Sequence, residues 1–168
     1  TNIKYLVDRN VKIWNEWPYE DFKKSEDFNG ETLEEFVEKI KNDDDFAKKH
    51  GNLGPVYGAQ WRNFNNEGTD QLMKLIDSLK NNPFSRRHII NMWQEQQMID
   101  DPKALVPCAF MTEWYVIEEE NKRKVNFTLT QRSQDVIPVF SINPAQYVML
   151  AMMVCNHLTF KTGIEHYV

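Results

Sequence analysis

A cysteine and an arginine are spaced so that they can meet in one site. Cys108 follows Pro107, and the pair Arg132-Ser133 comes about one strand later. A guanidinium near a thiol lowers the pKa of the thiol and so favours the nucleophilic thiolate. An arginine beside a serine also suits a phosphate group, which accepts hydrogen bonds from forked N–H groups and from a hydroxyl. Most cysteines in globular chains are small buried hydrophobic residues, so the pair alone suggests thiolate chemistry on a phosphorylated compound without establishing it.

The composition is that of one soluble globular domain. The chain has 168 residues, of which 41% are hydrophobic and 27% charged, and disordered chains have fewer apolar residues. The formal net charge of −5 argues against broad binding to nucleic acid or to anionic membranes. The two cysteines, Cys108 and Cys155, form no disulfide framework, which indicates a reducing compartment and predicts a cytoplasmic protein. Zinc-ligand motifs and apolar runs of 18 residues are absent from the sequence, so we expect no metal and no membrane span.

Helical patterns occupy the first half of the chain and its end. A first helix is expected over residues 2–9 with Thr1 as its cap, and Thr32 with Glu35 forms a capping box before another. Residues 70–80 form a third, expected to bury its leucines and isoleucine. Pro144 opens a last helix, whose inward residues are predicted to be Val148, Ala151, Met152 and Cys155. Residues 14–18 and 51–55 are expected to be irregular, and His50 to lie in a charged loop.

Three strands are expected between these helices, over residues 88–93, 109–117 and 124–130. The charged segment 118–123 is predicted to be the hairpin turn between the second and the third. Helices come first, then strands, then a helix, which predicts the α+β (mixed α/β) class in a single domain over residues 1–168.

Six ordered motifs resemble the thymidylate synthase family across nearly the whole chain. They are Ile13-Trp14-Asn15-Glu16-Trp17, the run from Gly54 to Arg62, Asp70-Gln71-Leu72, Ser85-Arg86-Arg87, Pro107-Cys108 and the run from Gln131 to Asp135. The resemblance implies a twisted mixed sheet with packed helices and a homodimer formed sheet to sheet. It also implies a methyltransferase that converts dUMP to dTMP, with 5,10-methylenetetrahydrofolate supplying both the carbon and the hydride.

The resemblance assigns a role to each matching residue. Cys108 matches the nucleophile that adds to uracil C6, which makes C5 nucleophilic. Tyr57 matches the tyrosine of the proton-transfer network at C5, and Asp135 a residue that contacts both the base and the folate. Trp14 and Trp17 match tryptophans on the folate side. Alternatively, these three aromatic residues are ordinary core residues.

The phosphate and the base have matching residues of their own. Arg132 and Ser133 would hold the nucleotide phosphate, with Gln131 supporting the site beside them. Arg86 and Arg87 match an arginine pair lent to the neighbouring subunit, although adjacent arginines also occur in solvated loops. Further along, Asn143 matches the asparagine that reads uracil, because its amide offers one donor and one acceptor to the O4 and N3 edge. An asparagine before Pro144 is equally suitable at a helix N-terminus.

The sequence departs from the family pattern at several places. Ala109 follows the cysteine where many members have histidine, the segment 136–142 lacks the usual glycine so that Val139 reshapes the pocket, and Trp93 is followed by Gln-Glu instead of Asn-Pro. The chain begins after the family's N-terminal phosphate-loop arginine and catalytic glutamate. It stops before the sugar-binding histidine and tyrosine and the folate-closing C-terminus, so we expect a longer native protein.

Two other functions fit the same residues. A phage-type dUMP hydroxymethylase would share the thiolate, the folate and the asparagine, but water would capture the methylene intermediate. Alternatively, the chain is a non-catalytic fragment that binds only a nucleotide or a partner subunit. The product separates these hypotheses, because methylation oxidises the folate to dihydrofolate and hydroxymethylation does not.

Overall fold

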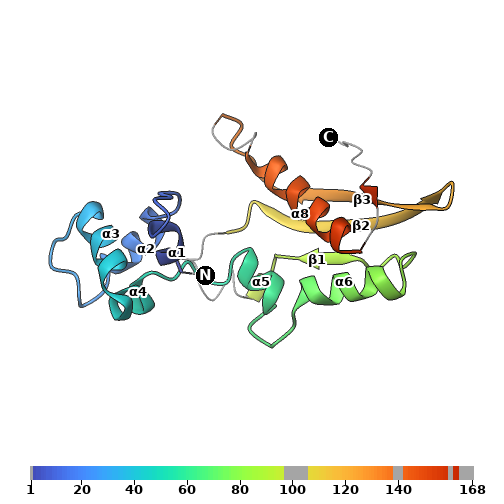
Figure 1. Cartoon of the computed structure of the whole chain (residues 1–168). Helices are drawn as coiled ribbons and strands as arrows, with labels where there is room; N and C mark the ends of the chain where they lie inside the picture. The colour runs from blue at the N-terminus through green and yellow to red at the C-terminus, as the bar shows by residue number, and fades with distance from the viewer. Residues whose placement is uncertain (1, 97–105, 138–141, 159–160, 163–168) are drawn as a thin grey trace. The chain divides into compact units, whose positions relative to one another are not determined.

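The chain forms two compact units. The computed structural model describes residues 2–96, 106–137 and 142–158, together with the backbone of 161–162. One unit comprises Thr1–Val56 and Glu95–Val106, and the other comprises Tyr57–Gln94 and Pro107–Val168 (Figure 1). The predicted Thr1 cap and Val139 lie outside the described residues. The single domain over residues 1–168 stays a prediction.

The first unit is helical. Its helices are α1 (Lys4–Val7), α2 (Glu16–Phe22), α3 (Leu33–Asn42) and α4 (Asp44–His50). The predicted capping box is confirmed at the start of α3, where the backbone N–H of Thr32 donates to the Glu35 carboxylate at 2.8 Å and the Thr32 hydroxyl accepts from the Glu35 N–H at 3.2 Å. The core is aromatic, with the Phe22 ring stacked on that of Phe36 at 5.2 Å.

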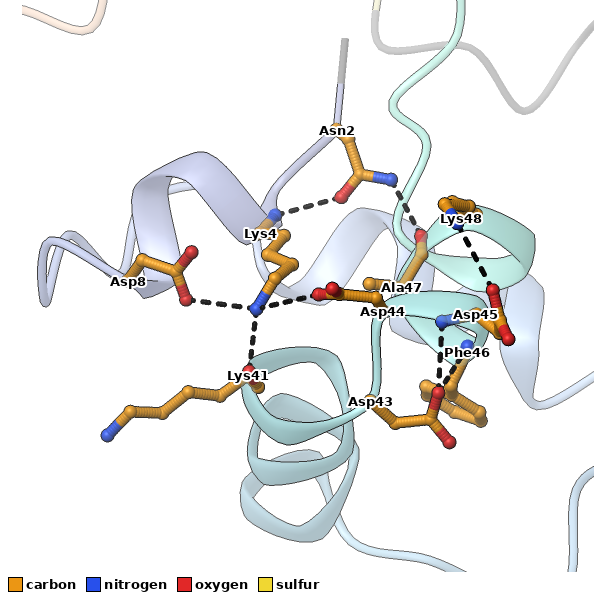
Figure 2. Close-up of polar contacts among 10 residues, drawn as sticks. All are labelled: Asn2, Lys4, Asp8, Lys41, Asp43, Asp44, Asp45, Phe46, Ala47 and Lys48. Carbon is orange, nitrogen blue, oxygen red and sulfur yellow. Dashed lines mark hydrogen bonds and ion pairs between the residues drawn. The ribbon is translucent and has the colours of Figure 1, made fainter.

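Polar contacts join α1 to α3 and α4 (Figure 2). The Lys4 ammonium lies 3.2 Å from the Asp8 carboxylate and donates to the Lys41 carbonyl at 2.6 Å. Asn2 bridges in the same region, because its amide donates to the Ala47 carbonyl at 2.6 Å and its side-chain oxygen accepts from the Lys4 N–H at 2.9 Å. These contacts close the ends of short helices that would not be stable alone.

Three expectations for this unit were wrong. The first helix spans only Lys4–Val7, although Ile3 and Val7 are buried as its pattern requires. Within the segment expected to be irregular, α2 begins at Glu16 and takes Pro18 into its first turn, where a missing N–H costs no helical bond. His50 ends α4 instead of lying in a loop, and its ring nitrogen lies 2.7 Å from the Asp27 carboxylate.

In its described residues, the second unit combines three helices with a sheet. Its elements are α5 (Gly58–Arg62), α6 (Gln71–Asn81), β1 (Ile89–Asn91), β2 (Ala109–Glu119), β3 (Lys122–Gln131), α8 (Ile142–Leu158) and β4 (Lys161–Thr162). The sheet order is β1-β2-β3-β4, with the first three strands antiparallel and β4 parallel to β3 (Figure 1). The predicted α+β class with a mixed sheet and packed helices is therefore confirmed.

The β2–β3 hairpin is tighter than predicted. Only Glu120 and Asn121 form its turn, at φ 51° and 59°, so that both strands extend into the segment expected to be loop. Two residues with positive φ make the turn whose twist matches that of the strands. A shift in register between Ala109 and Met111 interrupts the ladder at the start of β2. This irregularity is of the kind that re-aims neighbouring side chains, and it directly follows Cys108.

The core lies between one face of the sheet and the helices α6 and α8. Leu75 and Leu79 of α6 are buried as predicted, and Trp114 and Val116 of β2 pack with them. The predicted inward face of α8 is confirmed for Ala151 and Cys155, but Met152 is 45% exposed and Val148 only partly buried. The buried residues of α8 are Tyr147, Ala151, Val154, Cys155 and Leu158.

Candidate active site

The start of β2 and the end of β3 bring Cys108 and Arg132 together. The strands are antiparallel, and Ala109 pairs with Gln131, so the residues just outside this pair face each other. The backbone N–H of Arg132 donates to the Cys108 carbonyl at 2.9 Å. The Nε atom of Arg132 donates to the Pro107 carbonyl, also at 2.9 Å. The guanidinium is therefore tied to the backbone immediately before the half-buried cysteine.

Tyr57 completes this group from another part of the chain. Its phenolic oxygen accepts a hydrogen bond from the Cys108 backbone N–H at 3.0 Å. Burial raises the pKa of Tyr57, and the neighbouring Cys108 side chain raises it further, although the Cys108 N–H and the Arg132 charge act in the opposite direction. The phenol therefore stays protonated at neutral pH, with its proton close to the thiol.

Two predicted site residues have unusual backbone conformations. Tyr57 has φ 42° and Trp14 has φ 71°, a region that bulky residues rarely adopt. The other non-glycine residues with positive φ in the described part of the chain are asparagines and one glutamate in the hairpin turn. Backbone strain of this kind gathers at functional sites, where the surrounding structure holds it in place.

An apolar cluster packs against Tyr57 of the site. Met92, Ala109 and Tyr147 are buried together, and Trp61 and Leu129 pack against them. Ala109, which stands where many family members have histidine, is 1% exposed. The departure at this position thus places a small side chain inside the core and not in the site.

The end of β3 and the segment after it carry three further predicted site residues, Gln131, Ser133 and Asp135. Ser133 and Asp135 are exposed, and the Asp135 carboxylate accepts from the Ile137 N–H at 3.3 Å. Gln131, the last residue of β3, donates from its amide to the side-chain oxygen of Gln134 at 2.7 Å. Because the segment directly continues β3, it leaves the sheet at the same end as Cys108.

Three further predicted residues lie on separate elements. Arg86 and Arg87 are exposed and precede β1. Asn91 at the end of β1 pairs with Met111 near Cys108, so the two arginines lie beyond the other end of this strand. Asn143 lies in the first turn of α8 and is partly buried.

The two tryptophans predicted for the folate side belong to the other unit. Trp14 is partly buried just before α2, and Trp17 on α2 is 48% exposed. Their predicted place beside a folate stays a prediction. Within the described ranges of both units, no group of three His, Cys, Asp or Glu residues is arranged to hold a metal ion. None of the helices described is both long and apolar enough to cross a membrane.

Trp93, two residues after the end of β1, contacts the predicted site, although the sequence analysis named it only for a departure from the family pattern and gave it no role. The Cζ atom of Arg132 lies 5.8 Å from the centroid of the Trp93 ring. The signal that could have found it is the position of an aromatic residue just after a strand, at the sheet edge that also carries Cys108.

The fold and the site define an α+β protein with a cysteine, an arginine and a tyrosine joined by hydrogen bonds at one end of the sheet. A sequence profile of thymidylate synthase matches residues 1–167. The thymidylate synthase of Mesoplasma florum is 50% identical over 161 residues, which cover 96% of this chain and 54% of that protein. The thymidylate synthase of Mycoplasma mobile is 52% identical over 163 residues, covering 97% and 54%, respectively.

The thymidylate synthase of the Aster yellows witches'-broom phytoplasma is 51% identical over 156 residues, covering 93% of this chain and 51% of that protein. The chain belongs to the thymidylate synthase family, and the resemblance inferred from its six motifs is confirmed. It spans about half the length of the curated relatives it matches.

Proposed function

We propose that the protein acts as a thymidylate synthase, which catalyses the reductive methylation of dUMP to dTMP with 5,10-methylenetetrahydrofolate. The observation that carries the proposal is the hydrogen-bonded group of Cys108, Arg132 and Tyr57 in a chain of this family. The thiolate of Cys108 adds to C6 of the uracil, and C5 then attacks the one-carbon unit. Loss of the C5 proton would break the bond between the one-carbon unit and the folate nitrogen. Hydride from the tetrahydrofolate would then reduce the exocyclic methylene to a methyl group as dihydrofolate forms, and the Cys108 thiolate would leave C6 as the C5–C6 double bond re-forms.

The nucleotide would lie along the end of the sheet. Arg132 and Ser133 supply forked N–H donors and a hydroxyl for the phosphate. Asn143 at the start of α8 reads the uracil edge with one donor and one acceptor. Gln131 supports this site, and Asp135 contacts the base and the folate. The position of the segment after β3, at the Cys108 end of the sheet, supports these roles.

The folate would contact Trp14 and Trp17. Their apolar rings shield the reactive one-carbon unit from water, which would otherwise yield the hydroxymethyl product. The positive φ of Trp14 supports a functional role, because this conformation costs energy for a bulky residue and strained residues gather at functional sites. A reducing compartment such as the cytoplasm keeps the Cys108 thiol free for the reaction.

The protein would work as a homodimer formed through the sheet. Along β2, buried Trp114 and Val116 alternate with Glu113 and Tyr115 on the opposite face, where Tyr115 is 54% exposed. Among the residues that the structure describes, this face of β2 is exposed at Glu113 and Tyr115, which suits pairing with a second copy. Arg86 and Arg87 would reach the partner's phosphate site, since β1 separates them from their own.

Assays on the protein expressed from its complete coding sequence test the activity. With dUMP and 5,10-methylenetetrahydrofolate, we expect dihydrofolate absorbance to rise in the wild type and in Cys155→Ala, but not in Cys108→Ser. Cys155 is a matched control because burial raises its pKa to about 11, which keeps it a thiol. Intact mass and mass spectrometry of the nucleotide accompany the assay. A hydroxymethyl product without dihydrofolate would refute the synthase in favour of the hydroxymethylase, and no product would favour a non-catalytic fragment.

Coexpression of two inactive variants tests the shared site. One carries Cys108→Ser and the other Arg86→Ala with Arg87→Ala. Random pairing makes about half of the dimers mixed, and each mixed dimer has one intact site, so about a quarter of the sites are restored. Activity no higher than that of the separate variants would contradict the contribution of the arginines across the dimer.

A further inference from the structure

The Arg132 guanidinium is held by contacts on two sides. On one side its Nε atom donates to the Pro107 carbonyl at 2.9 Å. On the other, its Cζ atom lies 5.8 Å from the centroid of the Trp93 ring, within the range of a cation–π contact. A long, exposed arginine has many rotamers, and these two contacts restrict them to orientations along the sheet end.

The tryptophan is itself firmly placed. The Trp93 N–H donates to the side-chain oxygen of Asn91 at 2.9 Å, and the Trp93 ring meets that of Phe110 edge to face at 6.3 Å. The Met92 N–H donates to the Phe110 carbonyl at 2.7 Å, which extends the pairing of β1 with β2 up to this residue. Trp93 therefore continues a strand that is anchored to the sheet.

A glutamine secures the other edge of β1. The Gln71 amide donates to the Asn91 carbonyl at 2.7 Å, and its side-chain oxygen accepts from the Asn91 N–H at 3.0 Å. The side chain of α6 thus imitates a neighbouring strand for a residue at the sheet edge. A connected series of contacts runs from Gln71 through Asn91 and Trp93 to Arg132.

We propose that Trp93 is a positioning residue, which orients the Arg132 guanidinium for the phosphate of the nucleotide. This inference rests on the proposed function, because it takes a nucleoside monophosphate as the ligand. A guanidinium whose orientation is set before binding loses less entropy when it grips a phosphate with two N–H groups. Trp93 acts through Arg132, so it contributes to affinity for the phosphate and not to the chemistry.

Binding of dUMP and of deoxyuridine, which lacks the phosphate, separates positioning from a structural role. Both ligands are titrated by calorimetry against the protein expressed from its complete coding sequence. Trp93→Leu is expected to lower the affinity for dUMP about three- to tenfold, which corresponds to the usual energy of a partly shielded cation–π contact. The affinity for deoxyuridine is expected to change less than about twofold. Trp93→Phe, which keeps an aromatic face, is expected to restore most of the dUMP affinity.

The matched control is Tyr5→Leu. It removes the contact of Arg9 with the Tyr5 ring, at 3.7 Å, from the first unit, and it is expected to change neither affinity. If Trp93→Leu does not fold, as judged by circular dichroism, Trp93→Met makes the same comparison.

Suppose that the wild type binds dUMP. An unchanged dUMP affinity in Trp93→Leu, or an equal loss of affinity for dUMP and deoxyuridine, would then overturn this inference and leave the proposed function standing. Failure of the wild type to bind dUMP would overturn the proposed function together with it.

Discussion

Removal of the Tyr57 hydroxyl tests the centre of the site. Tyr57→Phe keeps the ring but deletes the oxygen that accepts from the Cys108 N–H at 3.0 Å. A partly buried N–H that loses its acceptor costs about 1–2 kcal/mol in the free energy of unfolding. If the phenol also relays the C5 proton, the turnover rate falls by about 10²-fold or more. Stability is measured by urea denaturation and turnover by dihydrofolate absorbance.

Tyr147→Phe is the matched control for this prediction. Tyr147 belongs to the same apolar cluster, but its hydroxyl donates only to the Met92 sulfur, at 3.7 Å. Sulfur is a weak acceptor, so we expect this variant to lose less than about 0.5 kcal/mol. Equal losses of stability in the two variants would refute the reasoning, because the cost would then follow from deleting any phenol in the cluster. A normal turnover rate in Tyr57→Phe would refute the proton-relay role.

Three further predictions concern stability, measured by urea denaturation. Gln71→Leu removes the hydrogen bonds of its side chain to the N–H and carbonyl of Asn91 and to the carbonyl of Gln60, and is expected to lose about 2–3 kcal/mol in the free energy of unfolding. The exposed substitution Met73→Ala should stay within about 0.5 kcal/mol, and similar values for both variants would contradict a stabilising role of Gln71 at the edge of β1. Burial lowers the pKa of His88. As the pH falls, His88 therefore takes up its proton near pH 6.5 in the unfolded chain and only at lower pH in the folded chain. Stability should therefore fall as the pH drops below about 6.5, and less so in His88→Gln; parallel pH profiles would rule out His88 as the cause. Thr32→Ala should lower the free energy of unfolding by about 1 kcal/mol because α3 loses its cap, and Thr32→Ser should keep the cap and most of the stability. A similar loss of stability in Thr32→Ser would point to the methyl group of Thr32 instead.

Local signals in the sequence were sufficient for the elements that depend on neighbours in the chain. The capping box at Thr32 and the helix after Asp70 are present, because a cap and an apolar stripe act within a few residues. The start of α2 was missed, since a proline in the first turn resembles one that breaks a helix. The inward face of α8 was predicted only in part, because Ala151 and Cys155 are buried but Met152 is not. The helix is apolar on most sides, so its pattern selects no single face, and packing against the sheet decides.

The candidate site likewise contains residues that the sequence predicted and contacts that it did not. Cys108 and Arg132 were predicted from residue types, spacing and family resemblance, and the antiparallel pairing of β2 with β3 places them together. The hydrogen bond from Cys108 to Tyr57 joins residues that are 51 positions apart, and no local pattern predicts it. Trp93 was named in the sequence analysis but given no role, because its contact with Arg132 depends on which strands are neighbours.

By itself, the sequence determined the α+β class, most helix and strand positions and the family, since these depend on composition, short-range periodicity and ordered motifs. Only the tertiary structure decided the tight turn at Glu120-Asn121, the buried face of α8, the acceptor of the Cys108 N–H and the support of Arg132 by Trp93. Such contacts depend on strand order, register and packing, which are set by the chain as a whole and not by the residues nearby.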